Sequence, residues 1–432
     1  MRNLRYIVLI SLLLARVGVG LSQDYARLSE RTILGTARYV GMSGAMTAIG
    51  GDPSAALDNP AGLGLYRRTE VMFTTDLAID KTPDRKPTLR FSLSQASVVL
   101  SLGTGRQDKG LIAHNIMFSY QRRRTFSRKM YGESMNGLSL SRILSSLDVD
   151  DIKYPTTRIY DANALSFQES GSINEFGFDW AMNYSNQWYV GAGLHVHSFG
   201  LVEDAIYSEE FDRDTTYLYN KTYVSHRGAG VSGAIGMICR PTGWLRLGLA
   251  FQTPSIGNLT TYTSATTEAQ TDSLRISWAP DLVLRDQNFH LPLRLSTSVA
   301  FQISAYGMVA FQYDYLHAKG QDDMHSLRAG FEIIPVLGLY INGGYACESS
   351  FKRDIEPFGI DPVFERRDTY SQYPKIAHYA SCAIGYRGTY MMVQMAYQYR
   401  WQKLDLYAHV LAAPYNINAD THRIVLTLAW HR

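Results

Sequence analysis

From residue 70 onward, hydrophobic and polar residues alternate with a period of two, in segments of about ten residues separated by turn signals. In the clearest pair of segments, 173–199, Phe176 and Trp180 fall on one face and Asp179 on the other. Successive side chains of a strand point to opposite faces, so each segment has an apolar and a polar or small face. This alternation is typical of strands that face lipid on one side and a lumen on the other, and it predicts an all-β transmembrane barrel.

The lengths of the connections predict the topology of this barrel. Bacterial outer-membrane barrels have short periplasmic turns and long external loops. Fifteen candidate strands can be counted, and an even number results if 271–284 lies inside an external loop, which predicts a 14-stranded antiparallel barrel with both termini periplasmic. Within the longest loop, 136–148 has the apolar spacing of a short amphipathic helix. The predicted external loops are 125–170, 202–222, 254–290, 350–374 and 404–420.

The N-terminus has the pattern of a secretory signal peptide. Arg2 and Arg5 precede an apolar run at 6–15, and Gly20 and Ser22 are small residues at the offsets that suit cleavage before Gln23, which predicts a signal peptide at 1–22. No later stretch offers the roughly 20 consecutive apolar residues of a spanning helix. An exported chain of this kind crosses a membrane only as a closed barrel. The 29 tyrosines agree with this, because Tyr is enriched where a barrel meets lipid and water.

Residues 38–66 differ from the rest of the chain. They are small, rich in glycine and weakly charged, yet too interrupted by Gly and Pro for a long helix or strand. Asp58, Asn59 and Pro60 predict a turn, because Asp and Asn bond their own backbone and Pro fixes φ. Such a peptide is unstable alone in water, so we expect a compact plug enclosed by something larger. A tight loop of a soluble protein is the alternative for these residues alone.

Three parts of this stretch resemble the N-terminal hatch of the FadL/TodX outer-membrane transporters, especially their Bacteroidetes branch: the run 41–45, the run 48–54, and Asn-Pro-Ala-Gly-Leu at 59–63. The resemblance implies a hatch at 23–68 that plugs the lumen of a 14-stranded barrel at 69–432. It further implies uptake of hydrophobic small molecules such as long-chain fatty acids through the outer membrane of a Gram-negative bacterium, with no metal or organic cofactor and no enzymatic activity. The hatch residues that it implies are Gly41, Met42, Gly44, Ala45, Asp52, Asn59, Pro60 and Ala61.

The same fold and hatch also resemble the type IX secretion shuttle proteins. That alternative implies a barrel that does not transport, but binds secretion-system or envelope proteins as a platform. Within the transporter family, ligand leaves sideways through a kinked third strand. The third strand predicted here, 112–124, contains no Gly or Pro, so the sequence gives no sign of such a kink.

Four arginines occupy inward positions of the predicted strands. They could attract the carboxylate of a ligand, or they could be lumen charges satisfied by acidic side chains and water, which is the more ordinary interpretation. The ligand-binding residues are therefore not identified from the sequence. The four are Arg90, Arg246, Arg294 and Arg400.

Other functions find little support. A net charge of +3, with no basic run carrying interleaved aromatic residues, argues against nucleic-acid binding. The glycine pattern at 228–233 is not followed by a helix, so it does not predict a dinucleotide site. His195 and His197 share one face of a strand, but no third ligand has useful spacing, which favours polar lumen residues over a metal site. The three cysteines lie apart inside strand-like runs, against a disulfide framework or zinc cluster.

Overall fold

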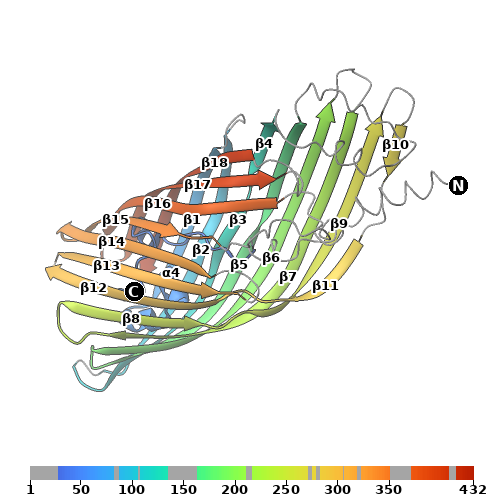
Figure 1. Cartoon of the computed structure of the whole chain (residues 1–432). Helices are drawn as coiled ribbons and strands as arrows, with labels where there is room; N and C mark the ends of the chain where they lie inside the picture. Colours follow the sequence, from blue (N-terminus) through green and yellow to red (C-terminus); the bar gives the residue numbers. More distant parts are fainter. Residues whose placement is uncertain are drawn as a thin grey trace.

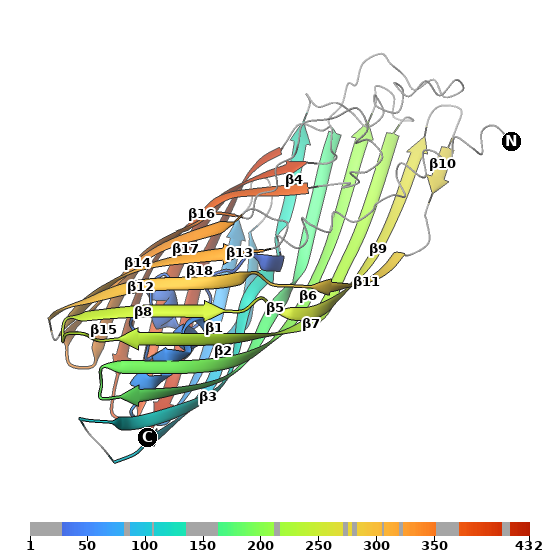
Figure 2. The same cartoon turned by 60° about the horizontal axis from the view of Figure 1, so that its bottom comes forward.

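The chain forms one closed β-barrel with a short segment of helices and turns inside it (Figures 1 and 2). The structure is a computed structural model. Every strand is antiparallel to its neighbour, and β1 pairs with β18 to close the sheet. The described residues are 28–81, 87–105, 108–134, 163–210, 217–270, 275–278, 283–304, 306–318, 323–350, 371–407 and 415–432.

Eighteen strand segments make up the wall, but some of them share one position in the barrel. β4 continues β3, because both pair with β5, and β9 continues β8, because both pair with β7. β10 and β11 pair with β9 and precede β12, which pairs with β8. The prediction of a 14-stranded antiparallel barrel is therefore confirmed.

The strand bounds, in chain order, are β1 Glu70–Lys81, β2 Thr88–Gly103, β3 Leu111–Phe126, β4 Lys129–Ser134, β5 Asn163–Tyr184, β6 Trp188–Glu210, β7 Tyr217–Cys239, β8 Leu245–Gln252, β9 Ile256–Gln270, β10 Arg275–Trp278, β11 Val283–Phe289, β12 Leu293–Ser304, β13 Gly307–His317, β14 Met324–Val336, β15 Leu339–Glu348, β16 Ser371–Arg387, β17 Met391–Tyr407 and β18 Tyr415–His431.

The two faces of the strands are those that the alternation predicts. In the hairpin of β5 and β6, Phe176 is 51% exposed on the outside, while Asp179 and His195 are fully buried inside the barrel. The turn between them places Ser185 and Asn186 at φ 55° and 57°. Two left-handed residues in succession give the turn whose twist suits a tight hairpin. The apolar outer surface makes the chain a membrane-spanning barrel.

Several strands are longer than the alternation indicates. The predicted loop at 202–222 is largely strand, since β6 and β7 stay paired as far as Glu210 and Tyr217. Likewise, 254–290 contains β9, β10 and β11, so 271–284 belongs partly to a strand of the wall and not wholly to a loop. Figure 1 shows β5, β6, β7 and β9 extending past their neighbours. A strand that leaves the lipid has water on its outer side, so its apolar alternation ends before its backbone pairing does.

Other predictions of this kind are corrected in part or lie beyond the description. β17 ends at Tyr407 and β18 begins at Tyr415, which shortens the loop predicted at 404–420. Similarly, β3, β4 and β5 take up both ends of 125–170. The predicted helix at 136–148 and the predicted signal peptide at 1–22 lie outside the described residues.

Residues 28–68, here called the inner segment, lie inside the barrel (Figure 2). They form the α-helices α3 (Ala37–Gly41) and α4 (Pro53–Asp58) and the 3-10 helix η1 (Pro60–Leu65). The shortness of these elements agrees with the many Gly and Pro residues. None of the helices in the described part of the chain is long and apolar enough to cross a membrane.

Candidate functional site

Glycines of the barrel wall make room for the backbone of the inner segment. A Cβ at Gly344 would lie 2.4 Å from the carbonyl carbon of Met42, and one at Gly330 would lie 2.8 Å from the carbonyl oxygen of Met42. A Cβ at Gly191 would lie 2.5 Å from the carbonyl carbon of Pro60. Any larger residue at these inward positions would push the inner segment away. The barrel and the inner segment are therefore shaped to each other.

The residues that the resemblance implied are all part of this packing. Met42, Ala45 and Ala61 are completely buried. A Cβ at Gly41 would lie 2.4 Å from that of Ala383 in β16, and Gly44 has φ +74°, a conformation that L side chains rarely adopt. These small residues allow close approach to the wall.

Asp52 and Asn59 hold the turns of the inner segment. The Asp52 carboxylate accepts hydrogen bonds from the backbone N–H groups of Ser54 (2.9 Å) and Ala55 (3.2 Å), so it caps α4. Asn59 accepts from the N–H of Ala61 at 3.1 Å at the start of η1, where Pro60 is the first residue. Its amide also donates to the carbonyl of Thr47 at 2.8 Å. Both side chains thus satisfy backbone groups that burial would otherwise leave unpaired.

Asp58, at the end of α4, lies at the centre of a buried ionic network. Its carboxylate pairs with Arg31 of the inner segment at 2.9 Å and with Arg294 of β12, and it accepts a hydrogen bond from Tyr39 at 2.6 Å. Burial alone would raise the pKa of Asp58, but Arg294, Arg31 and Arg328 hold this pKa well below its ordinary value. The carboxylate is therefore ionised, and it links the inner segment to the wall.

The network continues along the wall, and a second anchor lies nearer the end of the barrel with the short turns, which is predicted to be periplasmic. Asp314 of β13 contacts Arg294 at 3.0 Å and Arg328 at 3.2 Å. Separately, the Arg38 guanidinium contacts the Glu332 carboxylate of β14 through two nitrogens, at 2.6 and 2.9 Å. Two-pronged pairs of this kind fix geometry as well as charge.

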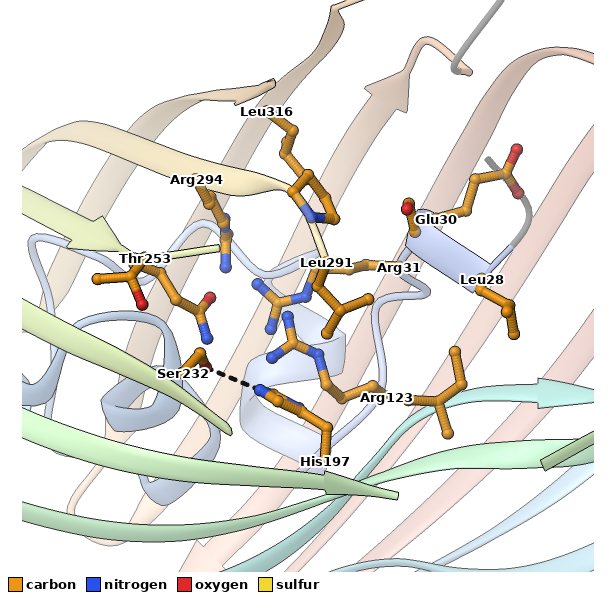
Figure 3. A pocket seen from close by; sticks show the side chains of 14 residues that line it. Leu28, Glu30, Arg31, Arg123, His197, Ser232, Thr253, Leu291, Arg294 and Leu316 are labelled. Atoms are coloured by element: carbon orange, nitrogen blue, oxygen red, sulfur yellow. Dashed lines mark hydrogen bonds between the residues drawn. The ribbon is translucent and has the colours of Figure 1, made fainter. Parts of the chain in front are cut away.

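A small pocket lies beside the Asp58 network, since Arg31 and Arg294 belong to both; Figure 3 shows its lining. The guanidinium groups of Arg31, Arg123 and Arg294 point toward one another across it, with His197 close by, hydrogen-bonded to Ser232. The cavity volume is about 20 Å³, which is room for about one water molecule. The pocket is lined by Leu28, Ser29, Glu30, Arg31, Arg123, Ile173, His197, Ser232, Gln252, Thr253, Leu291, Pro292, Arg294 and Leu316.

Several side-chain nitrogens of this pocket have no hydrogen-bond partner among the described residues. Nη1 of Arg31, Nε of Arg294 and Nδ1 of His197 are buried without a hydrogen-bond partner. Burial, and then the nearby charges of Arg123 and Arg294, lower the pKa of Arg31 to about 10. The pocket therefore retains guanidinium N–H groups that no acceptor in the described part of the chain uses, although its arginines also pair with the carboxylates of Asp58 and Glu175. Chemically, it suits a carboxylate or another small oxyanion.

Above the pocket, the inner face of the barrel gathers buried apolar side chains, with polar ones such as Glu169, Glu203 and Thr263 among them. Two clusters of buried apolar side chains line this part of the lumen. The interior of a water-filled porin is polar, so this lining is unusual for a channel that conducts ions and sugars. It suits a molecule with an apolar body. The first cluster comprises Leu28, Phe126, Ile173, Phe199, Leu201, Leu259, Phe289 and Leu291, and the second Met130, Leu165, Phe167, Ala205, Tyr207, Leu404, Ile417 and Ala419.

The wall loses its backbone pairing next to the pocket. β2 and β3 pair only from Gly103 and Ala113 up to Gln95 and Gln121. The outer parts of both strands continue without pairing to each other. The register of β1 with β2 and that of β3 with β5 shift close to this point. Bulges of this kind bend strands and end pairing, so an unpaired stretch of wall arises here although the third strand contains no Gly or Pro.

The bulge in β3 also serves the pocket. The register of β3 against β5 shifts between Arg122 and Arg124, and the intervening Arg123 reaches into the pocket, where it contacts Glu175 at 2.7 Å. Sequence alternation alone does not locate such a residue, because a bulge breaks the period of two. Arg123 was accordingly not predicted. Arg31 of the inner segment was not predicted either, whereas Arg294 was among the predicted inward arginines.

The predicted inward arginines have different surroundings. Arg294 lies in the pocket, whereas Arg90 contacts Asp80 at 3.5 Å, and Arg246 donates to the Gln302 side chain at 3.2 Å. Arg400 donates to the Tyr379 hydroxyl at 3.1 Å.

His195 and His197 face the lumen, as predicted. His195 contacts Asp179 at 3.0 Å and Glu175 at 2.9 Å, so it is part of a buried polar network. Within the described residues, no group of three or more His, Cys, Asp or Glu side chains is placed to hold a metal ion. The polar-lumen interpretation of the two histidines agrees with these contacts.

Barrel, inner segment and apolar outer face together define the class of the protein: an outer-membrane β-barrel with the FadL-type fold. No protein-family model and no curated protein sequence matches the chain. Among solved structures, it is similar to the CymD monoaromatic hydrocarbon channel (TM-score 0.56, 11% identity, covering 93% of this chain and 99% of that one). It is also similar to a Pseudomonas aeruginosa FadL homologue (TM-score 0.57, 11% identity, covering 93% of this chain and 98% of that one). A third similar structure is the Pseudomonas putida toluene transporter TodX (TM-score 0.55, 12% identity, covering 93% of this chain and 99% of that one). At these identities the likeness concerns the fold.

Proposed function

We propose that this barrel takes up hydrophobic small molecules with an acidic head group, such as long-chain fatty acids, across the outer membrane. In this proposal the mature chain consists of a hatch at 23–68 and a barrel at 69–432, after removal of a signal peptide at 1–22. The observation that carries the proposal is the apolar upper lumen that leads to the arginine-lined pocket of Figure 3. An apolar chain would lie in the former, and its carboxylate would meet Arg31, Arg123 and Arg294 in the latter.

Two further features support transport. The solved structures with the same fold include proteins described as a hydrocarbon channel and a toluene transporter. In addition, the unpaired stretch between β2 and β3 lies beside the pocket and provides a lateral way out of the lumen toward the lipid. The platform alternative does not require an apolar lining inside the barrel, so the lining favours transport.

The pocket as it stands is too small for a ligand, so entry requires the inner segment to yield. Arg31 and Arg294 both line the pocket and both hold Asp58. A ligand carboxylate that binds these two guanidinium groups competes with Asp58 for them. Binding would thereby loosen the contact that joins the inner segment to the wall.

Binding measurements on the purified barrel in lipid nanodiscs test the proposal. We expect oleate to bind more tightly than oleyl alcohol, which has the same chain without the charge. Leu259→Asn should weaken both ligands because it makes the apolar lumen polar. Arg31→Gln should weaken oleate by about tenfold or more and oleyl alcohol much less, since a charged hydrogen bond contributes about 1.5–3 kcal/mol. Isothermal titration calorimetry gives each affinity.

Matched controls are available for both changes. Arg67→Gln removes an exposed arginine of the inner segment outside the pocket, and Thr263→Asn changes an inward polar residue of the strand that carries Leu259. Both should leave oleate binding unaltered. Equal affinities for oleate and oleyl alcohol in the unmodified protein would contradict recognition of an acidic head group. Unchanged affinities in the Leu259→Asn variant would contradict binding of the ligand's chain in the apolar part of the lumen.

A further inference from the structure

The outer surface of the barrel carries the same side-chain pair three times. In each case a tyrosine hydroxyl lies within hydrogen-bond distance of Nδ1 of a histidine on the following strand, at 2.8, 2.7 and 2.7 Å. The pairs join β13 to β14, β15 to β16, and β17 to β18. We call them the outer belt, which consists of Tyr313 with His325, Tyr345 with His378, and Tyr397 with His422.

The three pairs lie at one height around the barrel. Across the sheet, His378 of β16 pairs with Cys347 of β15, and Cys347 pairs with Leu327 of β14. Leu327 lies two residues from His325 toward the periplasmic end, so His378 is displaced from His325 by two residues in that direction. His422 is displaced from His378 in the same way and by the same two residues. With a rise of about 3.3 Å per residue and about 4.8 Å between strands, this stagger corresponds to a strand tilt of about 35°. That is the tilt of strands in a transmembrane barrel, so the stagger keeps the pairs level.

The belt marks the outer edge of the apolar band. On its periplasmic side the outward residues are large and apolar, as Phe311, Phe331 and Ile424 show with exposures of 50, 44 and 43%. On its outer side the next outward residues include Asp323 and Asp420. Side chains at such a border meet the headgroups and the acyl esters or amides of lipid.

Each pair has a polar hydrogen left over. If the tyrosine donates to Nδ1, the histidine still has an N–H on Nε2; if the histidine donates from Nδ1, the tyrosine hydroxyl still has its hydrogen. All three tyrosines are at least 38% exposed. Further ring contacts stiffen two of the pairs, since Trp401 stacks on His378 and Tyr399 stacks on His422, with ring centroids 5.2 and 4.9 Å apart.

We propose that the outer belt is a lipid-binding face, on which three preset donors bind headgroup oxygens of outer-leaflet lipid while the acyl chains lie on the apolar wall below. Acidic and basic residues both occur just outside the belt, among them Asp323, Asp420 and Lys403, so attraction to charge alone does not select the lipid. Instead, hydrogen bonding to phosphate or acyl-carbonyl oxygens selects the lipid. Among the described residues, these Tyr–His pairs occur only on β13–β18, which makes this side the preferred lipid contact.

The test uses native mass spectrometry of the full barrel, delipidated and titrated with purified bisphosphorylated lipid A in detergent. In one variant all six belt residues become Phe, which keeps the rings and removes the donors. A second variant changes only the three tyrosines to Phe and leaves each imidazole a donor. The control replaces Tyr306, Tyr386 and Tyr390, exposed aromatic residues at the opposite end of the barrel, by Phe. Heat-modifiable gel mobility reports whether each variant is a folded barrel.

We expect the sixfold variant to bind the first lipid molecules about fivefold more weakly, since one net hydrogen bond contributes about 1 kcal/mol. The threefold variant and the control should stay close to the unmodified protein. Inorganic phosphate at the same concentration should not compete. Equal lipid binding by the folded sixfold variant would overturn the proposal. So would a dimer that the sixfold change dissociates, because the face would then contact a second copy of the chain.

Discussion

Asp58 links the inner segment to the barrel wall by ion pairs. It is 5% exposed and contacts three guanidinium groups and one phenol. Arg294 lies 236 residues away in the chain. The alternation of residues reveals that Arg294 faces inward, but it carries no information on which inward carboxylate lies opposite. Asp58 could be predicted as part of a turn and not as the centre of an ionic network.

We expect Asp58→Asn to release the inner segment. Removing one partner of a buried ion pair costs roughly 3–5 kcal/mol, because the remaining charges stay buried without compensation. Amide hydrogen exchange in 28–66 should therefore accelerate by about a hundredfold or more. Asp52→Asn is the matched control, since Asp52 caps the same helix and Asn caps equally well. Similar exchange in the two variants would contradict the role given to Asp58.

Acid should loosen the inner segment through the same residue. The pKa of Asp58 is held below the value of about 3.9 that an unfolded Asp has. Its contribution is therefore complete at neutral pH, begins to fall as the pH drops below about 4, and is lost on passing the folded pKa. Exchange in 28–66 should be insensitive to this contribution between pH 7 and 5 and rise below pH 4, after correction for the intrinsic rates. The Asp58→Asn variant should lack this additional rise.

Among the elements, strand faces were predictable and strand ends were not. The outward residues of β5 and β6 meet lipid, and burial of apolar surface produces the regular alternation. Farther out, β6 contains Glu203 and Asp204 in succession and still pairs with β7. There the ladder of backbone hydrogen bonds persists without lipid on the outside. The position of the water therefore determines where the sequence pattern ends.

The lipid-facing assignment of β8 can be tested with one substitution at two places. Leu249→Arg should cost roughly 2–4 kcal/mol of unfolding free energy, because Leu249 faces outward in the middle part of the apolar band. Leu337→Arg should cost at most about 1 kcal/mol, because Leu337 is 92% exposed in the turn between β14 and β15. Urea unfolding in vesicles measures both values. Equal losses would show that β8 does not face lipid with its leucines.

For the whole molecule, the strongest link between sequence and structure is the fit of the inner segment into the barrel. Its small residues could be recognised as a plug from composition and from resemblance. The matching glycines on the wall become meaningful only in three dimensions, since Gly330 and Gly344 lie against Met42 and Gly191 lies against Pro60. The outer belt has the same character, because its pairs repeat only when the strands are laid side by side.

Deleting residues 38–66 should leave a barrel that inserts and conducts. Strand pairing and lipid contact do not involve this segment, whereas its removal empties the lower lumen and exposes the inward glycines. Single-channel recordings in planar bilayers should show a conductance well above that of the intact protein. Asn59→Ala should give a smaller increase, because it removes the hydrogen bond to Thr47 and the one to Ala61 but leaves the ionic anchors. If the deletion conducts no better than the intact protein, another part of the chain closes the lumen, and 23–68 is not the hatch.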